Sequence, residues 1–211
     1  MQYGERLNTL THFGGALLAC GASIPLLARA LETYGPPGLL STAVYALSLV
    51  LMYACSSAYH GTSDGASGAL KHLLRRFDHL SIYLLIAGSY TPFCMLILDE
   101  TEGPLLLGAV WSLALAGMLQ EARAHAGARV LSLLVYLAMG WLAATMLGPL
   151  HAGLGPAGFA WLLGGGIAYT AGIAFYLLDA RLRHAHGIWH LFVLAGSAAH
   201  YVTIYRYVLQ D

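Results

Sequence analysis

The sequence predicts an all-α fold, a polytopic membrane protein built as a bundle of seven transmembrane helices. The chain of 211 residues is 58% hydrophobic. Only 9% of its residues are charged, against about 25% in a typical soluble domain. Its apolar residues gather in segments of about 20 residues, the length that a helix needs to cross the hydrocarbon core of a bilayer.

Seven apolar segments account for nearly the whole chain, so we expect a single seven-helix transmembrane domain over residues 1–211. Short connections separate the segments, and no linker, charged tail or low-complexity stretch marks a second domain. Their approximate ranges are 11–31, 39–60, 78–98, 104–121, 129–149, 157–178 and 187–208.

Each segment is expected to be a helix that crosses the membrane. The first follows Glu5 and Arg6 and lacks the short apolar core and cleavage site of a signal peptide, so we expect it to stay in the protein. The second ends at His60 and the third begins at Asp78. The fourth, fifth and sixth carry few polar side chains, and Gly164–Gly166 in the sixth favours close packing against a neighbouring helix. The seventh begins beside a pair of histidines.

The basic residues predict the orientation of the bundle, because Lys and Arg accumulate in cytoplasmic loops. Eight of the ten fall before segment one or after segments two, four and six, on one side of the predicted membrane. The loop after segment three carries Asp99, Glu100 and Glu102 instead. We therefore expect the N-terminus in the cytoplasm, the C-terminus outside and the protein in the cell membrane. The eight are Arg6, Lys71, Arg75, Arg76, Arg123, Arg129, Arg181 and Arg183.

Three histidines and one aspartate fall at segment ends on this predicted cytoplasmic side. His60 ends the second segment, Asp78 opens the third, and His186 and His190 lie in the first turns of the seventh. Histidine within a membrane segment is costly and usually faces the bundle interior or a water-filled cavity. Since the orientation rests on Lys and Arg alone, the shared depth of these four residues is a separate indication of a common site.

The histidine pattern predicts a zinc (Zn2+) site. Residues four apart project from one face of a helix, so His186 and His190 can bind one ion together. His60 supplies a third nitrogen, and three protein ligands with an open fourth position are typical of catalytic zinc. The alternative is that the three histidines make separate polar contacts between helices.

Asp78 and Ser56 are the candidate catalytic residues. Zinc lowers the pKa of bound water to near 7, and a nearby carboxylate is suited to position that water and take its proton. Ser56 lies one turn before His60, where its hydroxyl could orient water or stabilise an oxyanion. Other roles stay open: Asp78 could be a fourth ligand or cap the third helix, and Ser56 could bond the backbone of its own helix.

Glu5, Asn8 and His12 form a second polar stripe at the entry of segment one. The stripe could line a cavity mouth, support the metal ligands from behind or bond neighbouring loops. His200 lies about 15 Å beyond His190 along the helix and cannot share its ion. The histidines in or beside loops are expected to be solvated or interfacial. They are His72, His79, His125, His151 and His184.

As a set, these motifs resemble the haemolysin III family, the microbial branch of the progestin and adiponectin receptor superfamily. The resemblance runs nearly end to end. It implies that His60, His186 and His190 bind zinc and that Asp78 approaches the ion through water. It rests on Glu5-x-x-Asn8-x-x-x-His12, Ser56-x-x-x-His60, Asp78 with Gly88-Ser89-Tyr90-Thr91-Pro92, and His186-x-x-x-His190 with His200-Tyr201.

Three functions remain as alternatives. Receptor relatives and the related alkaline ceramidases imply a zinc-dependent hydrolase that acts on an acyl-linked lipid, a ceramide-like amide or an ester, from the cytoplasmic side. A non-catalytic regulator or sensor of membrane state would use zinc to tie helices together. A pore-forming haemolysin would need a continuous polar stripe, which segments four to six do not offer. The expected partners are a membrane lipid and zinc, and the neutral net charge with few basic residues argues against nucleic acid.

Overall fold

The computed structural model describes residues 5–63, 67–123 and 129–210, and every regular element within them is helical. His125 lies outside the described residues. The elements are α1 (Glu5–Gly61), α2 (Gly68–Leu96), α3 (Glu102–Arg123), α4 (Arg129–Trp141), the short helix η1 (Leu142–Met146), α5 (Leu147–Leu177), α6 (Ala185–Thr203) and the short helix η2 (Ile204–Val208).

Among the described residues, five helical stretches are long and apolar enough to cross a membrane, as an integral membrane protein with several spans requires. The two longest are Glu5–Gly61, with 57 residues, and Val130–Leu177, with 48. Large apolar side chains cover the outside of the bundle. Leu18 is 72% exposed and Ile24 is 73% exposed. Such a surface suits contact with lipid tails.

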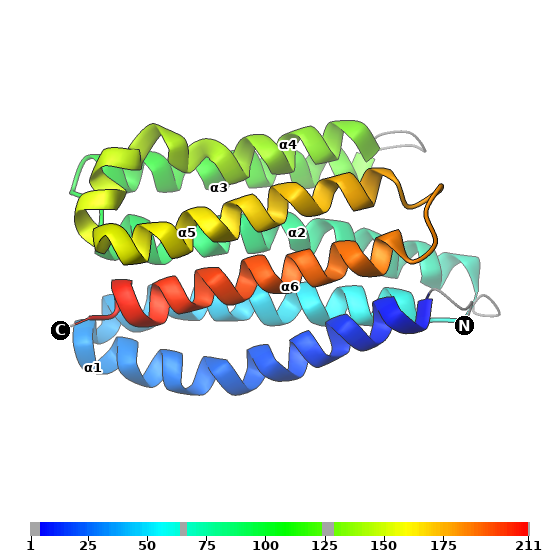
Figure 1. Ribbon diagram of the computed structural model, residues 1–211, viewed down its shortest axis with the longest axis horizontal. Helices are drawn as coiled ribbons and strands as arrows, with labels where there is room; N and C mark the ends of the chain where they lie inside the picture. Colours follow the sequence, from blue (N-terminus) through cyan, green and yellow to red (C-terminus); the bar gives the residue numbers. More distant parts are fainter. Residues whose placement is uncertain (1–4, 64–66, 124–128, 211) are drawn as a thin grey trace.

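The longest helix doubles back at Gly35. A straight helix of 57 residues would be about 85 Å long, nearly three times the thickness of the hydrocarbon core. Gly35 has φ 62° and ψ −146°, in the left-handed region that glycine adopts without penalty, and Pro36 and Pro37 follow it. The chain therefore returns as a second rod beside the first, as Figure 1 shows for α1.

A second reversal lies within α5, at Gly155 (φ 65°), and again a proline follows, Pro156. α4, η1 and the first turns of α5 lead into this reversal (Figure 1). In the described part of the chain, five long stretches, two of which double back, give seven helical rods, and these coincide roughly with the seven predicted segments. Their ranges are 5–34, 36–61, 68–96, 102–123, 129–154, 156–177 and 185–208.

The side chain of Tyr90 on α2 fixes the place where α4 ends. Its hydroxyl shares its one hydrogen between the carbonyls of Met139 (2.7 Å) and Gly140 (2.9 Å) and accepts from the backbone N–H of Ala143 (2.9 Å). These bonds satisfy backbone groups that the change from α4 to η1 would otherwise leave unpaired. In the bundle as a whole, α1 packs against α2 and α6, α2 packs against α3, and α5 packs against α6.

α2 begins earlier than the sequence predicts. It starts at Gly68, where the Ser67 hydroxyl accepts from the N–H of Leu70 at 3.3 Å, so Asp78 lies well inside the helix and does not cap it. The extra turns contain Lys71 and two arginines, which take this stretch out of any apolar segment although it is helical. Helix extent and membrane extent therefore differ here.

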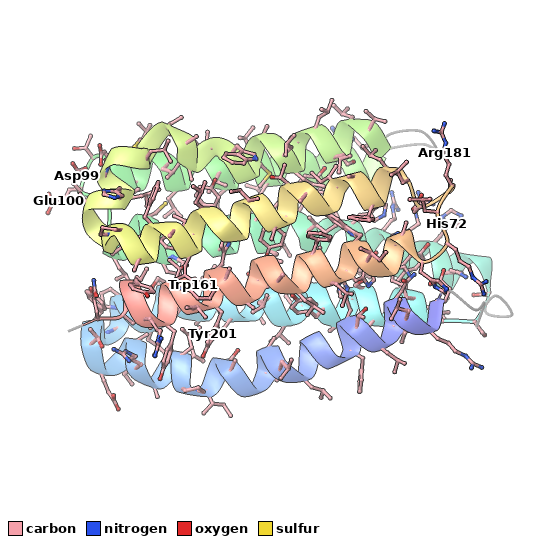
Figure 2. All side chains as sticks on the ribbon, viewed as in Figure 1. His72, Asp99, Glu100, Trp161, Arg181 and Tyr201 are labelled. Atoms are coloured by element: carbon pink, nitrogen blue, oxygen red, sulfur yellow. The ribbon has the colours of Figure 1, made fainter. Side chains whose placement is uncertain are left out.

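The two ends of the bundle differ in charge. Figure 2 shows His72 and Arg181 at the end where α1 begins, which we call the basic end, and Asp99 and Glu100 at the opposite, acidic end. Asp99 accepts hydrogen bonds from the N–H groups of Glu102 (2.7 Å) and Thr101 (2.8 Å), and these bonds hold the pKa of its carboxyl below the usual value. The charge asymmetry in the sequence thus becomes an asymmetry between the two ends.

Candidate metal centre

Three histidines from two helices come together inside the basic end. His60 lies at the end of α1, and His186 and His190 lie in the first turns of α6, one helical turn apart. One ring nitrogen from each lies within 4.8 Å of the others. The ring centroids of the three pairs are 4.9–5.0 Å apart. This group could hold a metal ion.

The Nδ1 atom of each histidine lies within hydrogen-bond distance of an oxygen atom. His60 Nδ1 lies 2.6 Å from Glu5 Oε2, and His190 Nδ1 lies 3.1 Å from the carbonyl oxygen of Asn8. His186 Nδ1 lies 3.4 Å from Asp179 Oδ2. Carboxylate and carbonyl oxygens only accept, so these contacts place the proton on Nδ1 and leave the lone pair on Nε2.

A second observation also indicates that the three histidines suit a metal ion. His60 is 5% exposed, and its Nε2 is buried without a hydrogen-bond partner among the described residues. A buried polar nitrogen without a partner is costly, and a bound cation would satisfy it. Histidine ligands of metals commonly donate their other N–H to a carboxylate or a backbone carbonyl, as these three do.

Asp78 and Ser56 lie beside the histidines. Asp78 is 9% exposed on α2, and its carboxylate is near enough to His60 and to the Ser56 hydroxyl to interact with both. Ser56 Oγ lies 2.7 Å from His12 Nδ1. Its hydroxyl therefore bonds a side chain of another rod, whereas the sequence left open a bond to the backbone of its own helix.

The stripe at the start of α1 lies against the histidines. Glu5 contacts His60, the Asn8 carbonyl contacts His190, and the His12 ring stacks on the His190 ring with centroids 3.6 Å apart and planes 7° apart. The His12 Nε2 atom is buried without a hydrogen-bond partner among the described residues. Of the roles that the sequence left open, these contacts match support of the histidines from behind, and the same three residues also line a cavity at this end.

A cavity of about 960 Å³ opens onto this group. Asp78, Ser56 and the three histidines line one part of it, and Tyr169 and His200 line a deeper part. Most of the remaining wall is apolar, with side chains such as Leu85, Ile86, Leu137 and Val193. The volume is at the upper end of the range for small-molecule sites, and the acidic and basic side chains on the wall, Arg75, Arg76 and Glu121 among them, belong to the basic end.

A second carboxylate–imidazole pair lies near the same end. His79 Nδ1 is 2.8 Å from Glu121 Oε1, and Ser132 donates to Glu121 Oε2 at 2.6 Å. Tyr136 donates to the His79 carbonyl at 3.0 Å. The sequence predicted a solvated or interfacial His79, but its side chain is 22% exposed and paired. The signal that could have found the pair is an acidic residue, Glu121, at the end of an apolar segment.

Comparison with known proteins identifies the family. A family model described as Haemolysin-III related matches residues 2–201. The chain belongs to the haemolysin-III-related family. It is 38% identical over 206 residues to the Hemolysin-3 homolog of Bacillus subtilis (strain 168), which covers 98% of this chain and 95% of the relative. It is 37% identical to Hemolysin-3 of Bacillus cereus, which covers 97% and 92%.

More distant similarity extends to an animal protein. The human Monocyte to macrophage differentiation factor is 30% identical over 173 residues, which is 80% of this chain and 70% of that protein. The expected haemolysin III membership is thus confirmed. In this haemolysin-III-related chain, the motif residues outside the cluster make helix contacts: Tyr90 fixes α4, His200 Nε2 lies 3.3 Å from the Leu162 carbonyl, and Tyr201 donates to the Ala22 carbonyl at 2.9 Å.

Proposed function

We propose that this chain is a zinc-dependent hydrolase of the cell membrane. Its seven rods would cross the bilayer with the N-terminus in the cytoplasm, because the basic residues gather at that end. The observation that carries the zinc assignment is the buried, unpartnered Nε2 of His60 beside two further imidazoles with occupied Nδ1 atoms. Three nitrogen ligands with a fourth position open are the set typical of catalytic zinc.

The side chains around the histidines have the chemistry that hydrolysis needs. Zinc held there would act as a Lewis acid and activate water for attack on a carbonyl. The Asp78 carboxylate would accept the proton of the attacking water and pass it to the leaving group. The Ser56 hydroxyl, held by His12, would orient that water or donate to the oxygen on which negative charge develops.

The cavity favours an acyl-linked lipid as the substrate. The apolar part of its wall suits an acyl chain, and its charged side chains and the three clustered histidines lie at the basic end, where the carbonyl of an amide or ester would be bound. A lipid whose polar part is at the cytoplasmic face would place its linkage at this depth. A ceramide-like amide and an ester lipid are the two linkages to compare.

A second function, a membrane regulator with structural zinc, has its own supporting observation. The three histidines come from α1 and α6, so an ion between them would join two helices that are distant in sequence. In that case the ion would stabilise the bundle without turnover. Pore formation, which the name Hemolysin-3 suggests for the Bacillus relatives, can be measured in the same preparation by leakage of a trapped dye.

The test uses purified full-length protein in liposomes. Elemental analysis should give about one zinc per chain for the wild type and almost none for His60→Ala. His79→Ala should keep about one, since His79 contacts Glu121 and lies outside the cluster. Wild type is then incubated with ceramide-like amides and with ester lipids, and free fatty acid is measured. Zinc without hydrolysis of either linkage would support the regulator, and dye leakage that survives His60→Ala would support a pore independent of the metal.

A further inference from the structure

We propose that Glu5, Asn8 and His12, which we call the first-helix face, form a positioning element for the metal ligands. The face would fix which ring nitrogen of His60 and of His190 is turned to the ion, and would hold the Ser56 hydroxyl in place. The proposal rests on the proposed zinc site and adds the part of the chain that sets its geometry and affinity.

The spacing of the first-helix face suits this role. Residues three and seven positions after Glu5 project from the same side of a helix, so the three side chains lie in one row along α1. The row faces the start of α6 and the end of the second rod of α1. Each member reaches a different part of the site, so the face acts on several groups at once.

Glu5 acts on His60. At 2.6 Å the contact between Glu5 Oε2 and His60 Nδ1 is a short, charge-assisted hydrogen bond. It keeps the proton on Nδ1, which leaves Nε2 as the ligand atom and makes that atom a better electron donor. Asn8 supports the arrangement, since its Nδ2 donates to the same Glu5 oxygen at 3.4 Å.

The backbone of Asn8 and the ring of His12 act on His190. The Asn8 carbonyl accepts from His190 Nδ1, with Thr11 Oγ1 also 3.2 Å from that nitrogen. The parallel His12 ring lies against one side of the imidazole and prevents it from turning about its bond to the backbone. His190 is 1% exposed, so packing neighbours restrict its orientation, and these contacts from α1 are among them.

His12 also connects the metal ligands to Ser56. Its Nδ1 atom contacts Ser56 Oγ at 2.7 Å, and Ser56 in turn faces Asp78. A Ser56 hydroxyl that donates to the Asp78 carboxylate requires His12 to donate from Nδ1. The same ring thus holds a ligand on one side and the hydroxyl beside the proposed base on the other.

The experiment measures metal affinity and ligand geometry rather than turnover. Zinc affinity is determined by competition with a chelator, and the visible absorption bands of cobalt-substituted protein report the ligand set. Glu5→Gln removes the charge and Glu5→Ala removes the acceptor as well. The matched control is Glu32→Gln, an exposed glutamate on the same helix.

We expect Glu5→Gln to weaken zinc binding and Glu5→Ala to weaken it further, within the roughly 10–100-fold range of such partners. The cobalt bands should shift, the metal-free protein should lose far less stability than the site loses in affinity, and Glu32→Gln should change neither. Wild-type affinity and bands in Glu5→Ala would overturn the positioning role but leave the zinc site standing. Equal losses of metal-free stability and affinity would also overturn it, and a wild type without zinc would overturn both proposals.

Discussion

Of the carboxylate–imidazole pairs near the basic end of this bundle, Glu5–His60 borders the candidate metal centre and Glu121–His79 joins helices instead. In one, Glu5 Oε2 lies 2.6 Å from His60 Nδ1; in the other, Glu121 Oε1 lies 2.8 Å from His79 Nδ1. Beyond His60 stand two more imidazoles, each with its Nδ1 already bonded. The pair alone therefore does not make a candidate metal site, whereas three imidazoles within reach of one ion do.

The second pair connects helices instead. Glu121 lies on α3, His79 on α2 and Ser132 on α4, so one carboxylate with two bonded oxygens joins three helices. Tyr136 adds a bond from α4 to the His79 carbonyl. Such buried polar contacts stabilise helix association in membranes, where apolar surface alone does not discriminate between partners.

The largest expected effect comes from removing the most buried ligand. His190→Ala should reduce bound zinc from about one per chain to almost none, because the two remaining imidazoles leave the ion with too few ligands. His79→Ala should retain zinc at the wild-type level. Elemental analysis of both purified variants checks this. Zinc retained by His190→Ala and lost by His79→Ala would reverse the assignment of the two pairs.

The next effect concerns Asp78, a carboxylate that faces Ser56 and His60. Asp78→Asn should retain zinc but lower lipid hydrolysis by about 100- to 10,000-fold, the usual contribution of a general base. The measurement is release of fatty acid at saturating substrate, with zinc content determined on the same sample. Asp99→Asn, a change of the same type at the acidic end, is the control and should leave both values unchanged. Loss of zinc in Asp78→Asn would make Asp78 a ligand instead.

The sequence predicted the seven rods because their apolar length and their separation are properties of the chain itself. It also predicted that His60, Asp78, His186 and His190 lie at one depth, since the positive charges give each segment its direction. The predicted start of α2, residue 78, was ten residues too late because residues 68–77 are helical but not apolar. Hydropathy measures membrane extent, and helix extent follows from the Ser67 cap.

The partners of the histidines could not be predicted in the same way. Asp179 contacts His186 from the turn that follows α5, and Glu121 on α3 contacts His79 on α2. Depth restricts such pairs to one end of the bundle but does not say which helices are neighbours. Glu5 illustrates the limit, because its position on the same face as Asn8 and His12 was evident, whereas its contact with His60 depends on how α1 folds back at Gly35.

A smaller effect is expected from the pair that connects helices. Glu121→Ala should lower the free energy of unfolding by about 1–3 kcal/mol, because it leaves His79 and Ser132 without their acceptor in a half-buried setting. Thermal unfolding in detergent measures this. Zinc content should not change. Glu102→Ala, near the acidic end of the same helix, is the matched control, and a zinc loss in Glu121→Ala would mean that the two pairs are coupled.

The smallest expected effect tests whether the close packing of α1 against α6 matters for zinc binding apart from the charge of Glu5. Gly187 lies between the two α6 ligands, and a β-carbon there would lie 2.5 Å from Leu7 Cδ2 and 3.2 Å from Asn8 Oδ1. Gly187→Ala should therefore push the start of α1 outward by a few tenths of an ångström, lengthen the Glu5–His60 contact and weaken zinc binding by less than Glu5→Ala does. Gly164→Ala is the control, since no atom lies within 4 Å of a β-carbon at that position. Chelator competition on both variants measures the difference.

A Gly187→Ala protein with wild-type zinc affinity would contradict this expectation. It would mean that the Leu7 side chain rotates away and that the histidines tolerate the added methyl group. The charge of Glu5, rather than the close approach of α1, would then distinguish the His60 pair from the His79 pair.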